Sequence, residues 1–487
     1  MAFRLRRPPS FSAKHEAYAY QLDAVRAVQE LPFSAVFHEQ GLGKTKIAVD
    51  LILLWLEQDV VDTVFVVTKK TLVQNWVDEL AVHSFVTPRV LSGNRRTNSI
   101  ALNSPVLIYV MNYEVISTNL ELIRMFLGTC RVAAILDESQ KIKNPESQLT
   151  KSFHLLSSQF ERRVIMTGTP VANRPYDIWS QIKFLDNGEA LGHSFSAFKA
   201  DMDLPAEPGQ SASYGRKLAG VMAKIEEFSV RETKESSGIQ LPRKTIRTHL
   251  VRMQPRQLEI YNSYRDQMRY ELSTPEGLFF DDAEVVLKRL LRLVQCASNP
   301  ALVDADYKEI PAKLLKLHEL IGAIAVDATK VIVWTSFVDN VEWLCRQLRA
   351  YTPAAVHGMR PVADRNAEIR RFKQDERCRI LVATPGAAKE GLTLTVASQA
   401  IFFDRGFSLD DYLQAQDRIH RISQEFECSV HNLIVGESID EWVDALLNAK
   451  HQAAQLTQGD VRISEFQQVF SANLRDALDR ILAPPDQ

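Results

Sequence analysis

The sequence predicts an α/β protein with two doubly wound parallel sheets and helical insertions between them. Short apolar runs rich in β-branched residues alternate with helical patterns, as in parallel βαβ units. Several of these runs end in polar clusters, and the carboxyl ends of parallel strands are where open α/β sheets bind ligands. A second series of the same kind starts near residue 313. Two α/β domains are therefore expected.

Length and composition indicate how many domains to expect and which classes of protein are excluded. At 487 residues the chain has room for roughly three domains. No apolar run reaches the ~20 residues that span a bilayer, so no membrane association is expected. The five cysteines are scattered without a C-x-x-C pair, which suits a cytoplasmic protein, nucleoid-associated if the host is a bacterium. With a net charge of −2, contact with nucleic acid would need a local positive groove.

The first strand and helix enclose a glycine-containing turn. An apolar run at 34–37 precedes it and a helical pattern at 47–56 follows. The turn consists of His38, Glu39, Gln40, Gly41, Leu42, Gly43, Lys44 and Thr45. Glycines let backbone N–H groups approach a polyphosphate at a helix N-terminus, where Lys44 would contact the terminal phosphates and Thr45 would bind Mg²⁺. The strict pattern has glycine in place of His38, so an ordinary strand–helix turn is the alternative.

Upstream of this turn, residues 17–25 have the apolar spacing of a helix. Within it, Gln21 follows an aromatic residue and offers both a donor and an acceptor to the edge of an adenine base. A surface glutamine on a helix is the alternative, because such residues are common.

The next predicted strands cover 63–68, 106–110 and 132–136. The last of them runs directly into Asp137 and Glu138, and two adjacent carboxylates at the end of an apolar strand are unfavourable unless they have partners. Asp137 fits the acidic partner of Mg²⁺, and Glu138 fits the residue that orients or activates the attacking water. A solvated strand end is the alternative, but the phosphate loop argues against it.

A fifth strand, 163–166, ends in a small turn rich in hydroxyl groups. The turn consists of Thr167, Gly168, Thr169 and Pro170. Such a turn can form hydrogen bonds with the acidic motif and so report the state of the phosphates.

Taken in order, these motifs resemble the first motor lobe of a superfamily-two helicase. The residues that carry the resemblance are Gln21, the loop 41–45, the acidic box Asp137-Glu138-Ser139-Gln140 and the turn 167–170. The sequence that flanks these motifs is similar to that of the Swi/Snf family, whose members are double-stranded-DNA translocases. This similarity rests on Glu39-Gln40 before the loop, Lys141-Ile142-Lys143-Asn144 after the acidic box, and Asp177-Ile178-Trp179-Ser180. In that family the loop usually lacks its first glycine, so His38 is no defect.

The resemblance continues through the second α/β series, whose strands are predicted at 330–337, 354–358, 379–384 and 400–404. Residues 386–395, with Gly391, resemble the fifth motif of the family, which couples DNA contact to the nucleotide. Residues 414–424 resemble the sixth. There Arg418 and Arg421 are three apart, which on a helix places both on one face. Two guanidiniums directed at the γ-phosphate would neutralise charge in the transition state, as arginine fingers do. A solvated helix face is the alternative, but the flanking residues match the motif in register.

The family implies two RecA-like lobes, with ATP and Mg²⁺ in the cleft between them. The expected divisions are lobe one at 1–190, helical protrusions and a linker at 191–311, lobe two at 312–460 and an amphipathic C-terminal helix at 461–487. The resemblance is to a minimal prokaryotic or phage-type member of the family.

The implied function is DNA-dependent ATP hydrolysis that drives translocation on duplex DNA through sequence-independent backbone contacts, aided by a protein partner that supplies targeting. Gln140 departs from the family, which usually has histidine at this position, so altered coupling between hydrolysis and DNA is expected. The alternatives are a helicase that separates DNA or RNA strands, an ATP-switched clamp without enzymatic activity, and a motor subunit of a DNA-repair or anti-phage defence assembly.

Overall fold

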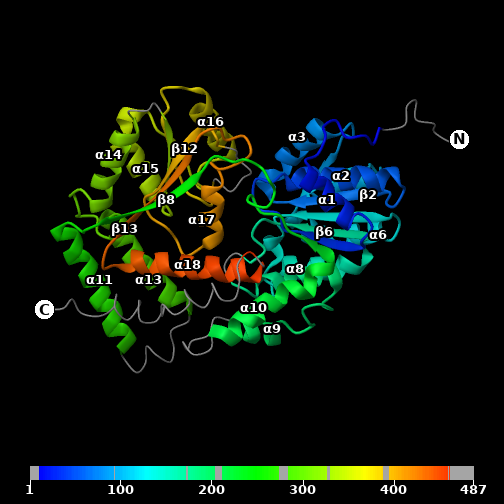
Figure 1. Ribbon diagram of the computed structural model, residues 1–487, viewed down its shortest axis with the longest axis horizontal. Helices are drawn as coiled ribbons and strands as arrows, with labels where there is room; N and C mark the ends of the chain where they lie inside the picture. The colour runs from blue at the N-terminus through cyan, green and yellow to red at the C-terminus, as the bar shows by residue number, and fades with distance from the viewer. Residues whose placement is uncertain are drawn as a thin grey trace. The chain divides into compact units, whose positions relative to one another are not determined.

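The computed structural model divides into two compact units. The first contains residues 1–239 with 452–467, and the second contains 240–451 with 468–487 (Figure 1). The structure describes residues 10–92, 94–171, 174–202, 211–273, 283–325, 329–387, 394–458 and 460. Each unit has one parallel sheet flanked by helices, which confirms the predicted fold class. The division of the chain into four parts stays a prediction.

The sheet of the first unit has seven strands, and every recorded pairing is parallel. In spatial order they are β3 (Arg89–Leu91), β4 (Ile108–Asn112), β2 (Thr63–Thr68), β5 (Val132–Asp137), β6 (Arg162–Met166), β1 (Phe33–Val36) and β7 (Ser229–Val230). The central strands are apolar and buried on both faces, as parallel strands between two helical layers must be. Their carboxyl ends meet at one edge of the sheet, which positions the site described below.

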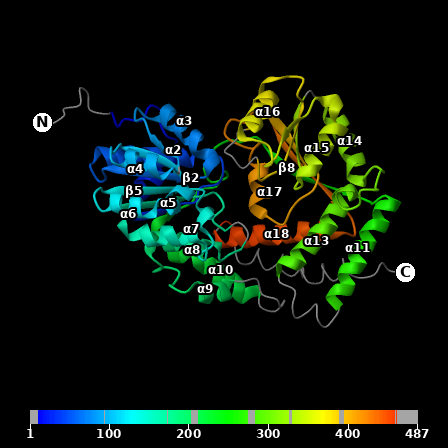
Figure 2. The ribbon, with the colours of Figure 1, turned by 180° about the vertical axis from the view of Figure 1, so that it is seen from behind.

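Helices cover both faces of this sheet. They are α1 (Ala19–Val28), α2 (Lys44–Glu57), α3 (Val73–His83), α4 (Arg95–Leu102), α5 (Tyr113–Thr118), α6 (Leu120–Leu127), α7 (Gln148–Leu156), α8 (Asp177–Asp186), α9 (Phe195–Met202) and α10 (Ser211–Ile225). Alternate residues of β2 show the two layers: Val64 and Val66 pack in one core with α1, α2 and α3. Phe65 points the other way and stacks on Phe126 of α6. Two opposite views show α2 and α3 on one side of the sheet and α6 and α8 on the other (Figure 1 and Figure 2).

The sheet of the second unit has six strands, also parallel in every recorded pairing. In spatial order they are β10 (Ala354–Val356), β11 (Ile380–Ala383), β9 (Lys330–Trp334), β12 (Ala397–Phe402), β13 (Cys428–Val435) and β8 (Lys244–Val251). β8 lies in a stretch expected from the sequence to contain helices and loops, and β13 is not among the predicted strands either. All eight residues of β8 pair with β13. β8 is an edge strand in which none of the eight residues is fully buried, and it lacks the apolar run that marks a buried strand.

The helices of the second unit form two layers as well. They are α11 (Pro255–Ser273), α13 (Ala283–Ser298), α14 (Ala312–Ala325), α15 (Val338–Gln347), α16 (Val362–Gln374), α17 (Leu409–Gln416) and α18 (Ile439–Thr457), the last turn of which belongs to the first unit. On one face, α16 and α17 pack against Ile332 and Trp334 of β9. On the other, α14 and α15 pack against Val331 and Val333.

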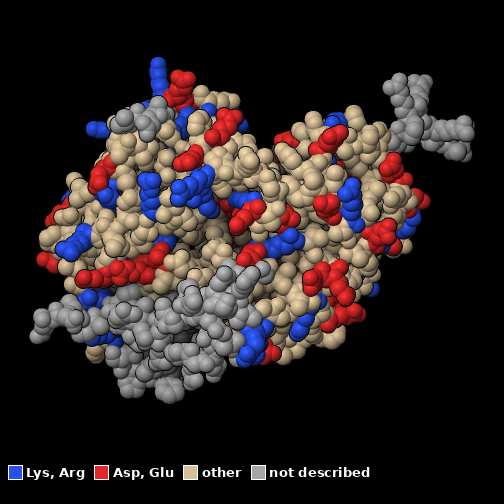
Figure 3. All heavy atoms as spheres, in the orientation of Figure 1, with Lys and Arg blue, Asp and Glu red and all other residues tan. Residues whose placement is uncertain are grey.

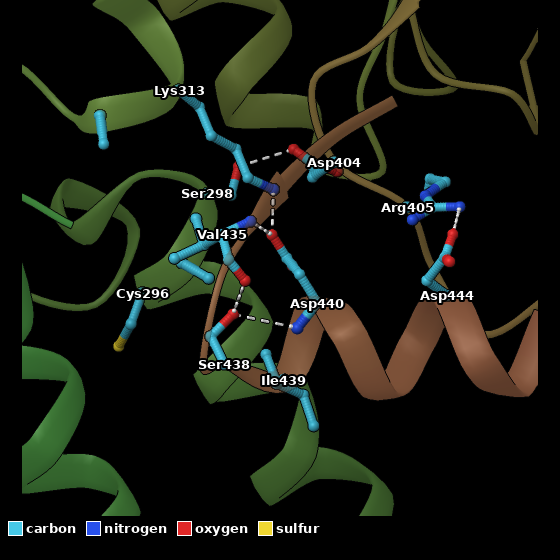
Figure 4. A network of polar contacts seen from close by, with 12 residues as sticks. Cys296, Ser298, Lys313, Asp404, Arg405, Val435, Ser438, Ile439, Asp440 and Asp444 are labelled. Atoms are coloured by element: carbon cyan, nitrogen blue, oxygen red, sulfur yellow. Dashed lines mark hydrogen bonds and ion pairs between the residues drawn. The ribbon is translucent and has the colours of Figure 1, made fainter. Parts of the chain in front are cut away.

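A buried polar network fixes the start of α18 in the second unit (Figure 4). The Lys313 ammonium lies 2.6 Å from the Asp440 carboxylate, and both side chains are almost wholly buried. Asp440 also accepts a hydrogen bond from the backbone N–H of Val435 at 3.0 Å. One turn further along α18, Asp444 accepts a hydrogen bond from Arg405 at 2.6 Å. Because breaking one partner of a buried pair leaves an uncompensated charge, these contacts attach α18 firmly to the loop that follows β12.

Acidic and basic side chains are interspersed over the face of the molecule in Figure 3, in keeping with the net charge of −2. Within the described ranges, no helix has the length and apolar character that crossing a bilayer requires. A polyanion such as nucleic acid would therefore have to bind in a local groove and not on a broad basic surface.

Candidate nucleotide-binding site

The glycine turn predicted as a phosphate loop lies between β1 and α2. Gly41 and Gly43 have φ angles of 92° and 70°, a region that L-residues with side chains rarely adopt. A Cβ on Gly43 would lie 2.4 Å from the Gln21 amide nitrogen, so another residue here would displace the Gln21 side chain as well as strain the backbone. α2 begins immediately after it, at Lys44. The loop therefore presents backbone N–H groups at the N-terminus of a 14-residue helix, as a phosphate site requires.

The predicted phosphate ligand Lys44 is folded back onto its own loop. Its ammonium donates to the carbonyl oxygens of His38 at 2.9 Å and Glu39 at 3.3 Å, and the residue is 9% exposed. Thr45 lies in the first turn of α2 and is half-buried. Lys44 thus sits beside the helix N-terminus in a conformation that its flexible side chain can leave when a phosphate offers stronger oxygen ligands.

Gln21, the predicted adenine contact, is buried in α1 and braces the loop. Its amide nitrogen donates to the carbonyl of Leu42 at 3.1 Å, and the hydroxyl of Tyr20 donates to the same oxygen at 2.9 Å. Its amide oxygen accepts the backbone N–H of Tyr18 at 3.0 Å. The adenine role stays a prediction, and the structure adds a role in loop geometry that the sequence analysis does not include.

His38 occupies the position where the strict loop pattern has glycine. Its ring is 2% exposed and lies 6.1 Å from the ring of Tyr20. Burial, with the positive charge of Lys44 as a second cause, lowers the pKa of His38 to about 4. The imidazole is therefore neutral at physiological pH and adds no charge to the loop.

The predicted acidic pair lies at the end of β5, on the same edge of the sheet. Asp137 Oδ2 accepts hydrogen bonds from Trp76 Nε1 at 2.8 Å and Thr68 Oγ1 at 3.1 Å. Burial, and next the negative charge of Glu138, raises the pKa of Asp137 above its usual value. Thr68 ends a strand predicted from sequence, whereas no local pattern identifies Trp76, which reaches Asp137 from α3.

The contacts of Glu138 include the side chains of Gln40, Gln140 and Lys69. Gln40 Nε2 donates to one of its carboxylate oxygens at 3.3 Å, and Gln140 Nε2 donates to the other at 2.8 Å. The Lys69 ammonium lies 3.7 Å from the second oxygen. Glu138 itself adopts a left-handed conformation with a φ of 56°. Such a backbone is uncommon outside glycine and is often found at functional sites, where the surroundings stabilise it.

Three of the predicted coupling residues, Gln140, Thr167 and Thr169, form a continuous chain of hydrogen bonds. Thr167 Oγ1 donates to Gln140 Oε1 at 2.7 Å, so Gln140 bridges the turn after β6 and Glu138. The backbone N–H of Thr169 donates to Thr167 Oγ1 at 3.1 Å. A Cβ on Gly168 would lie 2.8 Å from the side chain of Gln40, so glycine is needed where the turn passes the phosphate loop. The expectation that this turn contacts the acidic motif is confirmed.

Replacing Gln140 with histidine, the residue usual in the family, should change the ATPase rate and its stimulation by DNA. An imidazole has two ring nitrogens on a shorter side chain and cannot reproduce both the 2.8 Å bond to Glu138 and the 2.7 Å bond from Thr167. Steady-state ATPase assays with and without duplex DNA measure both quantities. The prediction is wrong if neither changes.

Arg418 and Arg421 lie in the second unit, but not on a helix, so the expectation that they share a helix face is wrong. α17 ends at Gln416, and a series of turns follows it. The Gln424 side chain donates to the carbonyls of Ile419 at 2.7 Å and Ala397 at 3.0 Å, which holds the chain in this tighter path. Arg418 is buried, and Arg421 Nε donates to the carbonyl of Asp417 at 3.1 Å.

The second unit has a hollow at the carboxyl ends of β9 to β12, with a volume of about 510 Å³. Arg365, Thr384, Asp404 and Arg405 are among the residues that line it. Asp404 is buried and accepts hydrogen bonds from the hydroxyls of Ser298 and Thr335, each at 2.7 Å, which fix its carboxylate beside the hollow. Figure 4 shows the contact with Ser298. Gly391, predicted to take part in coupling, and the helix predicted at 461–487 lie outside the described residues.

Two family models match the chain. The family model of the SNF2-related domain matches residues 33–302, which is more than half of the chain, and the model of the helicase conserved C-terminal domain matches residues 312–423. A candidate ATP-dependent helicase/translocase of Bacillus subtilis, YwqA, is 27% identical over 341 residues, covering 68% of this chain and 36% of that protein. The chain thus spans about a third of the length of this relative.

Two further relatives span nearly all of the chain. The DNA repair and recombination protein RAD54-like of Gallus gallus is 23% identical over 507 residues, covering 91% of this chain and 68% of that protein. The solved SWI2/SNF2 ATPase core of Sulfolobus solfataricus, in complex with double-stranded DNA, is 23% identical with a TM-score of 0.43 and covers 96% of this chain and 99% of that one. From the extent of the two family-model matches, the chain belongs to the SNF2-related family of helicase-like ATPases.

Proposed function

We propose that the protein hydrolyses ATP to ADP and phosphate and uses the energy to translocate on duplex DNA. One observation carries this proposal: the phosphate loop, the acidic pair and the turn after β6 converge at one edge of the first sheet and are joined through Gln40, Glu138, Gln140 and Thr167. A phosphate ligand, a water-activating carboxylate and a relay between them are the parts that phosphoryl transfer needs.

The contacts of each residue suggest its role in the proposed hydrolysis. Lys44 leaves the carbonyls of His38 and Glu39 for the terminal phosphates, where its charge offsets theirs. Glu138 accepts a proton from, or orients, the attacking water, and Gln40 and Gln140 keep its carboxylate in place. Because Gln140 also contacts Thr167, a change at the phosphates can reach the turn after β6.

Mg²⁺ fits the donor set at this edge. Asp137 and Glu138 bring two carboxylates together in a buried place, and their repulsion contributes to the raised pKa of Asp137. A divalent cation relieves that repulsion, and Mg²⁺ commonly takes one carboxylate and one hydroxyl while phosphate and water complete its shell. Asp137 and Thr45 would hold it. When bound, the ion neutralises charge on the transferred phosphoryl group.

For Arg418 and Arg421 we propose the role of arginine fingers. Both are fixed in the rigid turn after α17, and sequence motif six contains both. A guanidinium is always charged and presents several donors in a planar fork, which suits a phosphoryl group in transfer. Because both residues lie in a turn, the direction of each side chain is not set by helical spacing.

Duplex DNA is the proposed track. The Gallus gallus relative is by name a DNA repair and recombination protein. In the second unit, Arg365 and Arg405 line a hollow at the carboxyl ends of four strands, and hydroxyls of Thr384 and Ser408 line it too. Arginine and hydroxyl groups can contact backbone phosphates, and such contacts carry no sequence information. We therefore propose that binding is independent of sequence and weakens steeply with salt. A protein partner is proposed to supply targeting, and the cytoplasm or nucleoid is the proposed location.

Translocation without strand separation is tested with two substrates. With ATP, the protein should displace the third strand of a triplex and should not unwind a forked duplex. ATPase stimulation should be larger with duplex DNA than with single-stranded DNA or RNA. Unwinding of the fork without triplex displacement would show a strand-separating helicase instead, and stimulation by RNA alone would show an RNA-directed enzyme.

A further inference from the structure

An ion pair joins two distant parts of the chain next to the phosphate loop. Arg231 Nε donates to Asp460 Oδ1 at 2.7 Å, and a second guanidinium nitrogen contacts Asp460 Oδ2, so the contact is bidentate. The two residues are 229 positions apart and both belong to the first unit. Their side chains are 13% and 18% exposed. A bidentate, mostly buried arginine–carboxylate pair restricts geometry far more than an exposed lysine pair does.

Arg231 also contacts the strand that leads into the loop. Its Nη1 donates to the carbonyl oxygen of Phe37 at 2.8 Å, directly before His38. The guanidinium therefore connects Asp460 to the last residue before the phosphate loop. Asp460 is itself attached to the end of α18, because its backbone N–H donates to the carbonyl of Gln455 at 2.8 Å.

The segment around Arg231 runs beside the loop and sets its path. The N–H of Phe37 donates to the carbonyl of Val230, and the N–H of Glu39 donates to the carbonyl of Glu232, each at 2.8 Å. The N–H of Lys234 donates to the Glu39 carboxylate at 2.8 Å. The carbonyls of His38 and Glu39, which accept from Lys44, lie inside this stretch.

We propose that Asp460 is a positioning residue for the phosphate loop, acting through Arg231 and the carbonyl of Phe37. The carboxylate orients the guanidinium, the guanidinium fixes the end of β1, and the loop that starts there presents its N–H groups and Lys44 at the required place. The end of α18 thereby influences nucleotide affinity. This inference rests on the proposed function, because the bound ligand it concerns is the nucleotide.

Loss of the carboxylate has two physical effects on the loop. Arg231 keeps its charge in a mostly buried place without its partner, which is unfavourable and favours rotation of the guanidinium toward water. The bond to Phe37 is then lost with it. Its positive charge also lies close enough to His38 to contribute to the lowered pKa of that ring, so its movement alters the electrostatic environment of the loop.

Substitution Asp460→Asn tests the inference by ADP binding in titration calorimetry. ADP is used because it occupies the loop and is not consumed. We expect the Kd for ADP and the KM for ATP to rise about tenfold, the change expected for loss of one charge-assisted hydrogen bond. The kcat at saturating ATP should change less. A purely structural role would instead lower the amount of active protein, reducing kcat while leaving both KM and Kd unchanged, and that result would overturn the proposal.

Three variants act as controls. Asp62→Asn removes a carboxylate that contacts Arg131 at 2.7 Å at the start of β2, and because the strands are parallel this is the opposite edge of the sheet from the loop. It should leave the Kd for ADP unchanged. Asp460→Glu keeps the charge and should recover most of the affinity.

The third control, Arg231→Asp combined with Asp460→Arg, restores opposite charges but leaves no donor for the Phe37 carbonyl. It should raise the thermal midpoint relative to Arg231→Asp alone without restoring ADP affinity. Full recovery of affinity would contradict the relay through Phe37. Wild-type protein separates the two proposals: absence of ADP binding and of ATPase activity would overturn the proposed function and the inference together. Wild-type binding with unchanged affinity in Asp460→Asn would overturn the inference alone.

Discussion

Replacing Arg421 with alanine should lower kcat for ATP hydrolysis by about 10³–10⁵-fold, the range for loss of one arginine finger. In the proposed role the guanidinium offsets charge that develops during phosphoryl transfer, and such an effect is on the transition state more than on the ground state. The Kd for ADP should therefore stay close to that of the wild type. Stopped-flow phosphate release in the presence of duplex DNA measures the rate.

The controls for Arg421 come from the same unit. Arg377→Ala removes an exposed arginine from the segment after α16 and should leave kcat unchanged. Arg421→Lys keeps the charge but loses the planar fork, and it should recover only part of the rate. Since Arg421 also donates to the carbonyl of Asp417, the thermal midpoint of each variant must be recorded. Wild-type kcat in folded Arg421→Ala would exclude the finger role.

Substitution Glu138→Gln should lower kcat by about 10²–10⁴-fold while ATP still binds, because glutamine cannot accept the proton of the attacking water. The side chains have the same shape, and glutamine tolerates the left-handed backbone at this position about as well as glutamate. The variant should therefore fold normally and accumulate with ATP bound. Single-turnover hydrolysis and direct ATP binding measure the two effects separately.

Glu114→Gln is the matched control, since Glu114 is an exposed carboxylate in the same unit that contacts Lys141 at 3.2 Å. It should hydrolyse ATP at the wild-type rate. If Glu138→Gln turns over ATP as fast as this control does, Glu138 is not the water-activating residue. The ATP-bound Glu138→Gln protein is also suited to capture of the proposed partner from the native host.

Much of the candidate site is predictable because its motifs are local in sequence. Gly41, Gly43 and Lys44 lie within four residues, and Asp137 directly follows a buried strand, so the strand–turn–helix pattern already indicates where each side chain belongs. Parallel topology then brings the ends of β1, β5 and β6 to one edge. The hydrogen bonds of Gln140 follow from this same convergence.

Other features depend on contacts that no local pattern encodes. β8 is a strand because it pairs with β13, more than 170 residues later, and none of its own residues is fully buried. Arg418 and Arg421 have the spacing of a helix face, yet α17 ends before them. The side chain of Gln424 donates to a backbone carbonyl in the turns that follow and so stabilises a non-helical path. Tertiary hydrogen bonds outweigh helix propensity here, because propensity amounts to only a few tenths of a kcal/mol per residue.

By itself, the sequence determined the fold class, the family and the loop, acidic and turn motifs of the first unit, since each is a short pattern with one structural reading in the context of alternating strands and helices. Only the tertiary structure decided how Gln21 braces Leu42, how Trp76 reaches Asp137 and how Asp460 contacts Arg231 beside Phe37. The physical reason is that these contacts join side chains from separate elements. Their partners are chosen by packing of the whole unit and not by spacing along the chain.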